Sequence, residues 1–123
     1  MSLIDIIFNP AVSGLIGSGA LFVFAGLLMK KFPPKKINSL YGYRTPSSMK
    51  SQERWDFAQI YGAKQLMKTG AAMCLFSLIV LTIHRFFPLN ESLSTGILIF
   101  VLLFATILLL LNVESAIKKR FGD

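Results

Sequence analysis

The positions of apolar and charged residues along the chain predict helices that cross a membrane. Three stretches contain no Asp, Glu, Lys or Arg, and these are Ile6 to Met29, Thr69 to Ile83 and Ser92 to Val113. A helix needs roughly 20 apolar residues to cross about 30 Å of hydrocarbon, so the first and third stretches are long enough. The second is long enough if Lys64 and Lys68 extend toward one membrane surface. We therefore predict that residues 1–123 form a single all-α membrane domain, with transmembrane helices over about 10–29, 64–84 and 94–113.

The connection between the first two predicted spans, residues 30–63, is the polar part of the chain. The Pro33-Pro34 pair ends the first helix, because proline does not fit a helix interior. A new helix can begin at Thr45 or Ser48, whose side chains are suitable N-caps, and continue into the second span. One stripe of this helix carries Trp55, Gln59, Gly62 and Leu66, while Glu53, Asp56 and Lys64 lie away from it. The pattern favours an amphipathic cytoplasmic helix at the membrane surface, with Trp55 at headgroup depth.

The net charge of +7 is distributed unevenly along the chain, and its distribution predicts an orientation. Of the 13 Lys and Arg residues, nine lie between the first and second predicted spans, three lie in the C-terminal tail and only Arg85 lies elsewhere. Because loops rich in positive charge stay in the cytoplasm, we predict the N-terminus outside and the C-terminus inside. The lysines of residues 30–36 are then attracted to anionic lipid headgroups, so we expect membrane lipids as partners. We do not expect direct contact with nucleic acid. A dedicated partner site in this lysine run is the alternative.

The composition excludes several classes of protein. Of the 123 residues 54% are hydrophobic and 15% are charged, which is more apolar surface than a soluble domain of this size can bury. The single cysteine, Cys74, excludes an internal disulfide framework. The chain has one histidine, His84, and it has neither a His-Glu cluster nor a Gly-rich phosphate loop. We therefore expect no metal site, no cofactor and no enzymatic activity. His84 is expected at the membrane interface on the outer side.

A turn in the polar connection carries the most specific motif of the chain. Its residues are Asn38, Tyr41-Gly42-Tyr43-Arg44-Thr45, Ser48-Met49, Trp55, Ala58 and Gly62, followed by a hydrophobic span. This pattern resembles the signature of the SdpI immunity protein family of bacterial membrane proteins, over about Gly14 to Val113. The resemblance implies a multi-pass protein of the bacterial inner (plasma) membrane that gives resistance to a secreted antimicrobial peptide toxin. Some members of this family also signal by holding a transcriptional repressor at the membrane, so the resemblance implies this second role as well. Full-length immunity members look longer, so a short, core-only member is expected.

Eight residues of this region form the predicted binding site. They are Asn38, Tyr41, Gly42, Tyr43, Arg44, Thr45, Trp55 and Gln59. Arg44 can hold a lipid phosphate or a carboxylate with its planar guanidinium group, or it can pair with Glu53 or Asp56 and clamp the connection to the helix. Trp55 can anchor the helix at the membrane interface or stack on a ligand. The clamp and the anchor are the favoured interpretations.

A small oligomeric transporter or channel is the alternative function. Coupled carriers usually keep an ionisable residue inside the membrane, and the three predicted spans are built from uncharged stretches. Small residues of the first span form two ridges that allow close approach of another helix, Ser13, Gly17 and Ala20 on one, or Gly14, Ser18 and Ala25 on the other. Such ridges serve either packing within the protomer or a homo-oligomer, whereas the Leu-rich third span has the composition of a lipid-facing helix.

Overall fold

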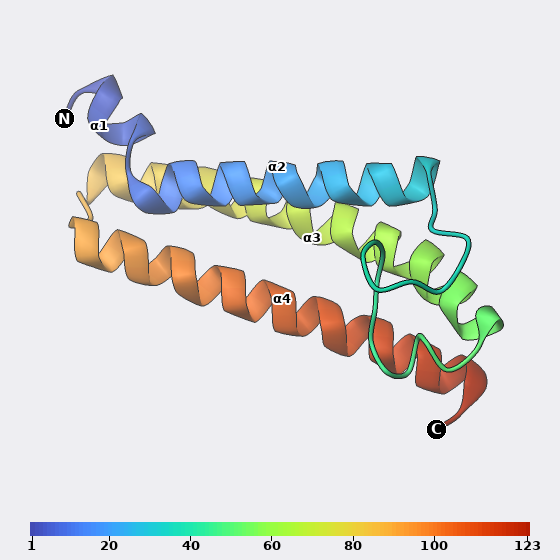
Figure 1. Ribbon diagram of the computed structural model, residues 1–123. Coiled ribbons are helices and arrows are strands. Elements are labelled where there is room, and N and C mark those ends of the chain that lie inside the picture. Colours follow the sequence, from blue (N-terminus) through green and yellow to red (C-terminus); the bar gives the residue numbers. More distant parts are fainter.

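The computed structural model describes all residues, 1–123, and its regular elements are all helices (Figure 1). They are α1 (Leu3–Ile7), α2 (Pro10–Lys31), α3 (Gln52–Phe86) and α4 (Glu91–Phe121). The helices α2, α3 and α4 are each long and apolar enough to cross a membrane. They run side by side, with α1 at one end of the bundle and the α2–α3 connection at the other (Figure 1). The prediction of an all-α chain with three candidate membrane spans is confirmed.

Polar side chains fix the first residues of the long helices. Asn9 caps α2, and Pro10 occupies its first turn, where a missing N–H costs no hydrogen bond. Ser51 caps α3, and its hydroxyl accepts a backbone N–H three residues on at 3.2 Å. The prediction that Thr45 or Ser48 caps this helix is wrong, because their hydroxyls bind each other's backbone N–H groups within the preceding turn.

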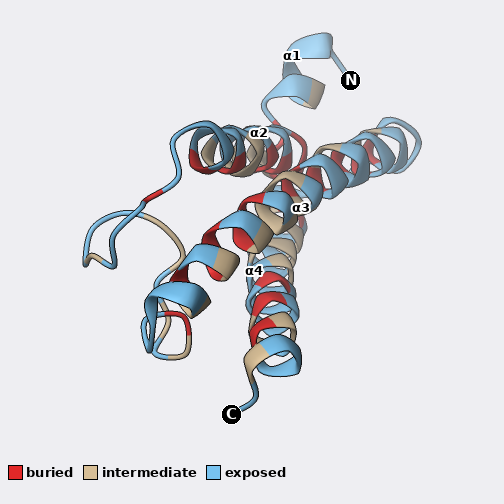
Figure 2. Cartoon of the chain, turned by 90° about the vertical axis from the view of Figure 1, so that its right-hand side faces the viewer, coloured by how far each residue is buried: buried red, intermediate tan, exposed pale blue.

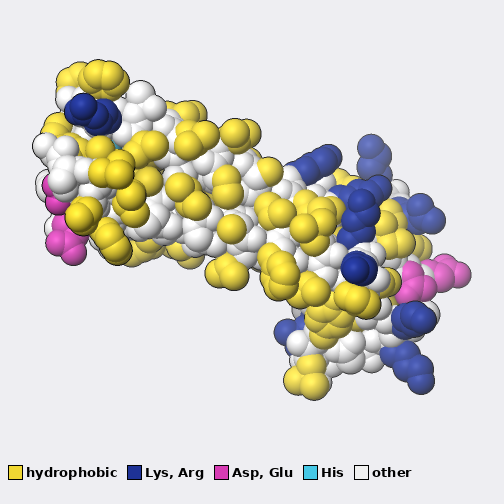
Figure 3. Space-filling view, turned by 90° about the horizontal axis from the view of Figure 1, so that it is seen from above, with side chains coloured by type: hydrophobic (Ala, Val, Ile, Leu, Met, Phe, Trp, Pro, Cys, Tyr) yellow, Lys and Arg dark blue, Asp and Glu magenta, His cyan; other side chains and the backbone are white.

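Two helices extend well beyond the predicted spans. The 35-residue α3 is continuous, as predicted, and its first turns precede the uncharged stretch Thr69 to Ile83. Likewise α4 continues to Phe121, about two turns beyond the predicted end of the third span. Both extensions lie beside the α2–α3 connection (Figure 1). This end, called the basic end below, gathers most of the cationic side chains (Figure 3), namely Lys30, Lys31, Lys35, Lys36, Lys50, Arg54, Lys118, Lys119 and Arg120.

Glycines bring the backbones of α2 and α3 into close contact. A Cβ atom added to Gly19 would lie 2.6 Å from O of Gly70, and one added to Gly26 would lie 2.8 Å from O of Ala63. Side chains at these glycines would therefore force the two helices apart. The close approach is made by glycines that neither predicted ridge included.

The two predicted ridges of small residues on α2 face different surroundings. A Cβ atom on Gly14 would meet the side chain of Leu98 on α4, so the ridge through Gly14 is used within the protomer. Gly17 has nothing within 4 Å of its Cβ position, and its ridge neighbours Ser13 and Ala20 are exposed. Packing within the protomer thus accounts for one ridge and leaves the other on the outer surface.

Two separate apolar clusters hold the bundle together. One lies toward the α1 end and consists of Ala11, Val12, Leu15, Met73 and Val80, with residues of α4 packed against it. The other lies at the basic end and consists of Ala58, Val113 and Ile117. Buried positions line the inner faces of the helices in Figure 2, and on the face seen in Figure 3 apolar side chains are spread over the surface between the two ends. Such a surface suits helices that are surrounded by lipid.

Polar side chains near the α1 end of the bundle are hydrogen-bonded within the protein. The hydroxyl of Ser77 donates to a backbone carbonyl of α2 at 2.9 Å. Nδ2 of Asn9 donates to Oγ of Ser94 at 2.8 Å and so links α2 to α4. His84 is only 6% exposed, and its Nδ1 accepts from N of Leu89 at 3.0 Å. These bonds keep the polar groups satisfied between helices that bury little surface.

Candidate functional site

Residues 32–51, the cap segment, connect α2 to α3 and fold over the basic end (Figure 1). Asn38 starts a turn, in which its Oδ1 accepts from N of Leu40 at 2.9 Å and from N of Tyr41 at 2.7 Å. The hydroxyl of Tyr41 donates to O of Phe32 at 2.7 Å. Phe32 is the C-cap of α2, where carbonyl groups lack partners within the helix. Tyr41 therefore binds the turn back to the end of α2.

Gln59 of α3 holds the centre of the family-like motif. Its Oε1 accepts from N of Tyr43 at 2.7 Å, and its Nε2 donates to O of Tyr43 at 2.8 Å. Gln59 is 1% exposed, so both backbone groups of Tyr43 are satisfied in a buried site. Gly42 has a φ of +108°, and a Cβ atom there would lie 2.5 Å from Oε1 of Gln59. Only glycine meets both conditions without strain.

Trp55 fixes the start of the cap segment to α3. Its indole Nε1 donates to O of Pro34 at 2.7 Å, and the side chain is 0% exposed. The expectation of a Trp55 anchor among lipid headgroups is therefore wrong, because the cap segment covers the ring. Gln59 and Gly62 of the same stripe are also buried, so this stripe faces protein.

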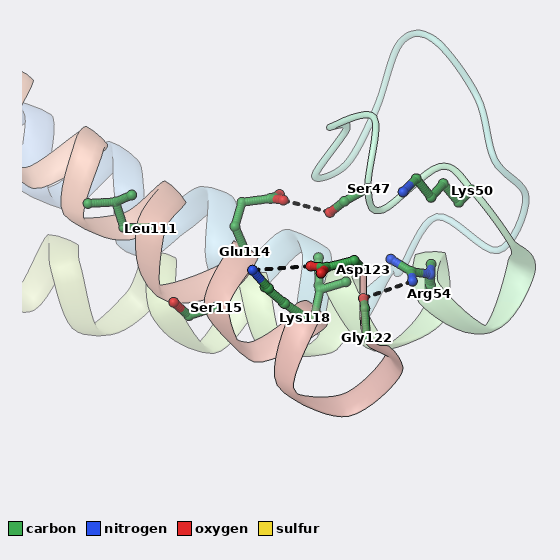
Figure 4. Close-up of a pocket in the computed structure, with 10 residues that line it drawn as sticks. Ser47, Lys50, Arg54, Leu111, Glu114, Ser115, Lys118, Gly122 and Asp123 are labelled. Carbon is green, nitrogen blue, oxygen red and sulfur yellow. Dashed lines mark hydrogen bonds and ion pairs between the residues drawn. The ribbon is translucent and has the colours of Figure 1, made fainter.

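Glu114 of α4 accepts three hydroxyl groups from the cap segment. The hydroxyl of Tyr43 donates to Oε1 at 2.7 Å, and that of Thr45 donates to the same oxygen at 2.6 Å. The hydroxyl of Ser47 donates to Oε2 at 2.6 Å (Figure 4). These are short bonds to a charged acceptor, which are stronger than bonds between neutral groups. Together with Gln59 they join the cap segment to two helices at once.

The pKa values of Tyr43 and Glu114 shift in opposite directions. Burial, reinforced by the neighbouring carboxylate of Glu114, raises the pKa of Tyr43 well above its ordinary range. Partial burial pushes the pKa of Glu114 upward, but the hydrogen bonds from Ser47, Thr45 and Tyr43 together outweigh it and leave the pKa below its usual value of 4.5. At neutral pH Tyr43 is therefore the proton donor and Glu114 the charged acceptor.

Arg44 lies on the outer side of this network. Its guanidinium group is exposed and donates to O of Ser39 within the cap segment. The predicted clamp to Glu53 or Asp56 is wrong, since the ion pair of the structure is Lys118 with Asp123, at 3.1 Å. The clamp between the connection and the helices exists, but neutral groups and Glu114 form it.

A cleft of about 320 Å³ opens beside Glu114 (Figure 4). Lys50, Arg54 and Lys118 line it together with Ser47 and Glu114. Arg54 donates to O of Gly122 at 3.0 Å, so part of this wall is already engaged by the C-terminal residues. No group of three His, Cys, Asp or Glu side chains lies close enough to hold a metal ion. The cleft is thus lined by three cationic side chains and two engaged carboxylates, Glu114 bound to the hydroxyl groups and Asp123 paired with Lys118.

Most of the predicted site residues meet in one place. Gly42, Tyr43, Thr45 and Gln59 form the network with Glu114, and Trp55 supports it through Pro34. Asn38 and Tyr41 build the adjoining turn, whereas Arg44 points away.

The sequence interpretation missed Glu114, which stands one residue after the third uncharged stretch. The available signal was a single acidic residue between Glu91 and Asp123, in a region whose other charges are basic.

Comparisons with known proteins agree with the motif. Residues 35–113 match the sequence model of the SdpI/YfhL protein family. The chain belongs to this family. Over 69 residues it is 44% identical to the "Uncharacterized protein YfhL" of Bacillus subtilis (strain 168). That match covers 56% of this chain and 62% of the relative, so it spans less than two thirds of the relative's length. No solved structure matches the chain.

All eight predicted site residues lie within the segment that the family model matches, and Glu114 follows it directly. The network is thus built from the family-matched segment and the first residue beyond it. The chain is a membrane protein of the SdpI/YfhL family with three candidate spans.

Proposed function

We propose that this chain is an immunity-type protein of the bacterial inner membrane that gives resistance to a secreted antimicrobial peptide toxin. Its membership of the SdpI/YfhL protein family carries the proposal, since the family resemblance implies this role. In the proposed orientation the N-terminus lies outside and the basic end lies in the cytoplasm, as the asymmetry of Lys and Arg favours.

The architecture of the basic end suits a protein that binds another molecule. The cap segment is held to α3 and α4 by side-chain hydrogen bonds, and Tyr41 ties its turn to the C-cap residue of α2, so its outer surface has a defined shape. Exposed cations surround it, and they are Lys30, Lys31, Lys35, Lys36 and Lys50. In this proposal the cationic surface holds an acidic face of a transcriptional repressor, while the membrane-embedded helices meet the peptide.

A challenge experiment tests the proposal. A sensitive bacterial host expresses the full chain and is exposed to a dilution series of a purified membrane-active peptide toxin that kills the host. We expect survival at peptide concentrations that kill cells carrying the empty vector, with unchanged ion and drug flux measured by dyes. Glu114→Gln should lower survival, whereas Glu53→Gln, which removes an exposed carboxylate of the same end, should not. Immunoblots of membrane fractions check that the variants are present in equal amounts.

Two outcomes would contradict the proposal. Survival equal to that of the empty vector would remove the immunity role. Increased ion or drug flux in unchallenged cells would favour the small oligomeric transporter or channel instead. A cytoplasm-specific reporter fused after Asp123 checks the orientation, and a silent C-terminal reporter alongside an active one at Met1 would overturn it.

A further inference from the structure

A lateral groove runs between α3 and α4 from the middle of the bundle to the basic end. The part of the groove at the middle of the bundle is a hollow of about 420 Å³ lined mainly by apolar side chains, among them Phe76, Phe100 and Phe104. The next hollow, of about 460 Å³, is lined by Phe57, Tyr61, Ser115, Lys119 and Arg120. Both hollows include Asn112 in their walls, so they are consecutive parts of one groove.

Helix periodicity supports this continuity. On α3, Phe57, Tyr61, Thr69 and Phe76 recur at intervals that keep them on one face. On α4, Val101, Ala105, Leu108, Asn112 and Ala116 do the same. These two faces form the walls of the groove. Glu114 lies on a different face of α4 from Asn112, and its cleft meets the groove at Ser115, which lines both.

The mouth of the groove carries cations without an acidic partner. Arg120 lies over the rings of Phe57 and Phe121, at 5.1 and 5.6 Å from their centroids, and neither Lys119 nor Arg120 takes part in an ion pair. Both cations line the same hollow as Asn112, which is also in the wall of the apolar part. The acidic residues Glu53 and Asp56 line an adjoining hollow, which shares Phe57, Tyr61 and Arg120 with the mouth of the groove. Neither carboxylate forms an ion pair with Arg120, and Lys64 lies in the same wall as the two acidic residues.

We propose that this groove binds one anionic phospholipid from the leaflet at the basic end. The order of groups along the groove matches the order of groups in such a lipid. An acyl chain lies against Phe76, Phe100 and Phe104, the amide of Asn112 meets the glycerol ester, and the phosphate lies among Tyr61, Lys119 and Arg120. Basic pockets between membrane helices recognise anionic headgroups in this way. The site is independent of the proposed immunity role.

Lipid retention by the purified full chain tests the site. The protein is delipidated in mild detergent and mixed with equal amounts of phosphatidylglycerol and phosphatidylcholine that carry the same acyl chains. Native mass spectrometry then counts the bound lipids. We expect one retained phosphatidylglycerol in clear preference to phosphatidylcholine. Lys119→Gln should reduce this retention about fivefold, the contribution of one cation near a membrane surface. Lys118→Gln removes a neighbouring lysine that pairs with Asp123 and lines the Glu114 cleft instead of the groove, and it should leave retention unchanged.

A second pair of variants tests the apolar part. Ala72 is exposed and lines the groove, whereas its neighbour Ala71 is exposed but does not. Ala72→Phe should fill the groove and abolish retention, and Ala71→Phe should retain the lipid. Melting curves identify any variant that fails to fold, and the lysine pair then still decides the question.

Several results would overturn the proposal. One is equal retention of the two lipids, and another is equal retention by Lys119→Gln and Lys118→Gln. Displacement of the lipid by inorganic phosphate alone would indicate an anion site without an acyl chain. Photocrosslinking from residue 72 to a membrane-active peptide, in preference to lipid, would assign the groove to a peptide helix.

Discussion

Replacing Glu114 by Gln should loosen the cap segment without unfolding the bundle. Glu114 accepts three hydroxyl groups at 2.7, 2.6 and 2.6 Å. Hydrogen bonds to charged groups contribute roughly 1.5–3 kcal/mol each and neutral ones roughly 0.5–1.5 kcal/mol. The Gln side chain keeps one acceptor oxygen, and its NH₂ group faces Ser47 or the other hydroxyls. Because water reaches this partly exposed site and replaces part of the loss, we expect a total of about 2 kcal/mol. This corresponds to opening of the cap segment that is about 30-fold more frequent.

Hydrogen exchange measures this opening directly. Backbone N–H groups of Tyr43, Thr45, Ser48 and Met49 donate to partners within the site, so their exchange requires the cap segment to open. In Glu114→Gln these amides should exchange about 30-fold faster, while amides in the middle of α2 and α3 keep wild-type rates. Glu53→Gln serves as the matched control. Exchange in Glu114→Gln at the wild-type rate would refute the assignment of Glu114 as the residue that holds the cap.

The same amides should respond to pH through Glu114. Its pKa in the folded protein lies below the value of 4.5 that it regains when the cap opens. The open state therefore binds more protons, and the stabilisation is complete above pH 4.5 and is lost as the pH falls through the folded pKa. After correction for intrinsic rates, wild-type exchange should rise in this acidic window. The Glu114→Gln variant should lack that component, and an identical acid response in both proteins would contradict the mechanism.

Three further predictions concern other parts of the structure. Gly70→Val should lower the melting temperature in detergent markedly, because a Cβ atom there meets the backbone of α2, whereas Gly17→Ala should not, since nothing lies within 4 Å. Trp55→Phe should speed exchange in the cap segment less than Trp55→Ala does, because Phe keeps a buried aromatic ring and loses only part of the packed volume together with the hydrogen bond to Pro34. Arg44→Lys should leave exchange in the cap segment near wild type. Loss of peptide resistance in that variant would indicate that Arg44 contacts a ligand. Unchanged resistance would exclude this role.

The sequence was sufficient to predict the candidate spans because their signal is local. Uncharged runs long enough to cross the hydrocarbon can be counted directly. Helices α3 and α4 contain the second and third runs, and α2 contains the first from Pro10 onward. The helix periodicity of the region before the second span was also correct. Trp55, Gln59 and Gly62 share the buried face of α3, as their spacing predicted. Periodicity identifies a face, but it does not say whether lipid or protein covers it. The covering surface is residues 32–51, whose fold depends on turns and individual hydrogen bonds.

Local features of the sequence could not predict that Glu114 is the hydrogen-bond partner of the motif. Tyr43 and Glu114 are separated by 71 residues, and the choice between Glu114, Glu53 and Asp56 depends on how α4 is placed beside α3. Opposite charge suggested a partner for Arg44, yet exposed ion pairs contribute little and do not determine a fold. Three hydroxyl groups that converge on one partly buried carboxylate contribute more. The hydroxyls of Thr45, in the motif, and of Ser47, two residues later, are therefore structural partners of α4.

Glu114 and Asn112 place the cap network and the proposed lipid groove on the same turn of α4. They are two residues apart, so their side chains leave the helix in nearly opposite directions. Glu114 binds the cap segment on one side, and Asn112 lines the groove on the other. At this end α4 meets α3 through the small cluster of Ala58, Val113 and Ile117. Tyr43, Phe57, Tyr61 and Phe121 pack against this cluster, so apolar contacts and the hydrogen bonds of Glu114 together fix the turn of α4 that also lines the groove.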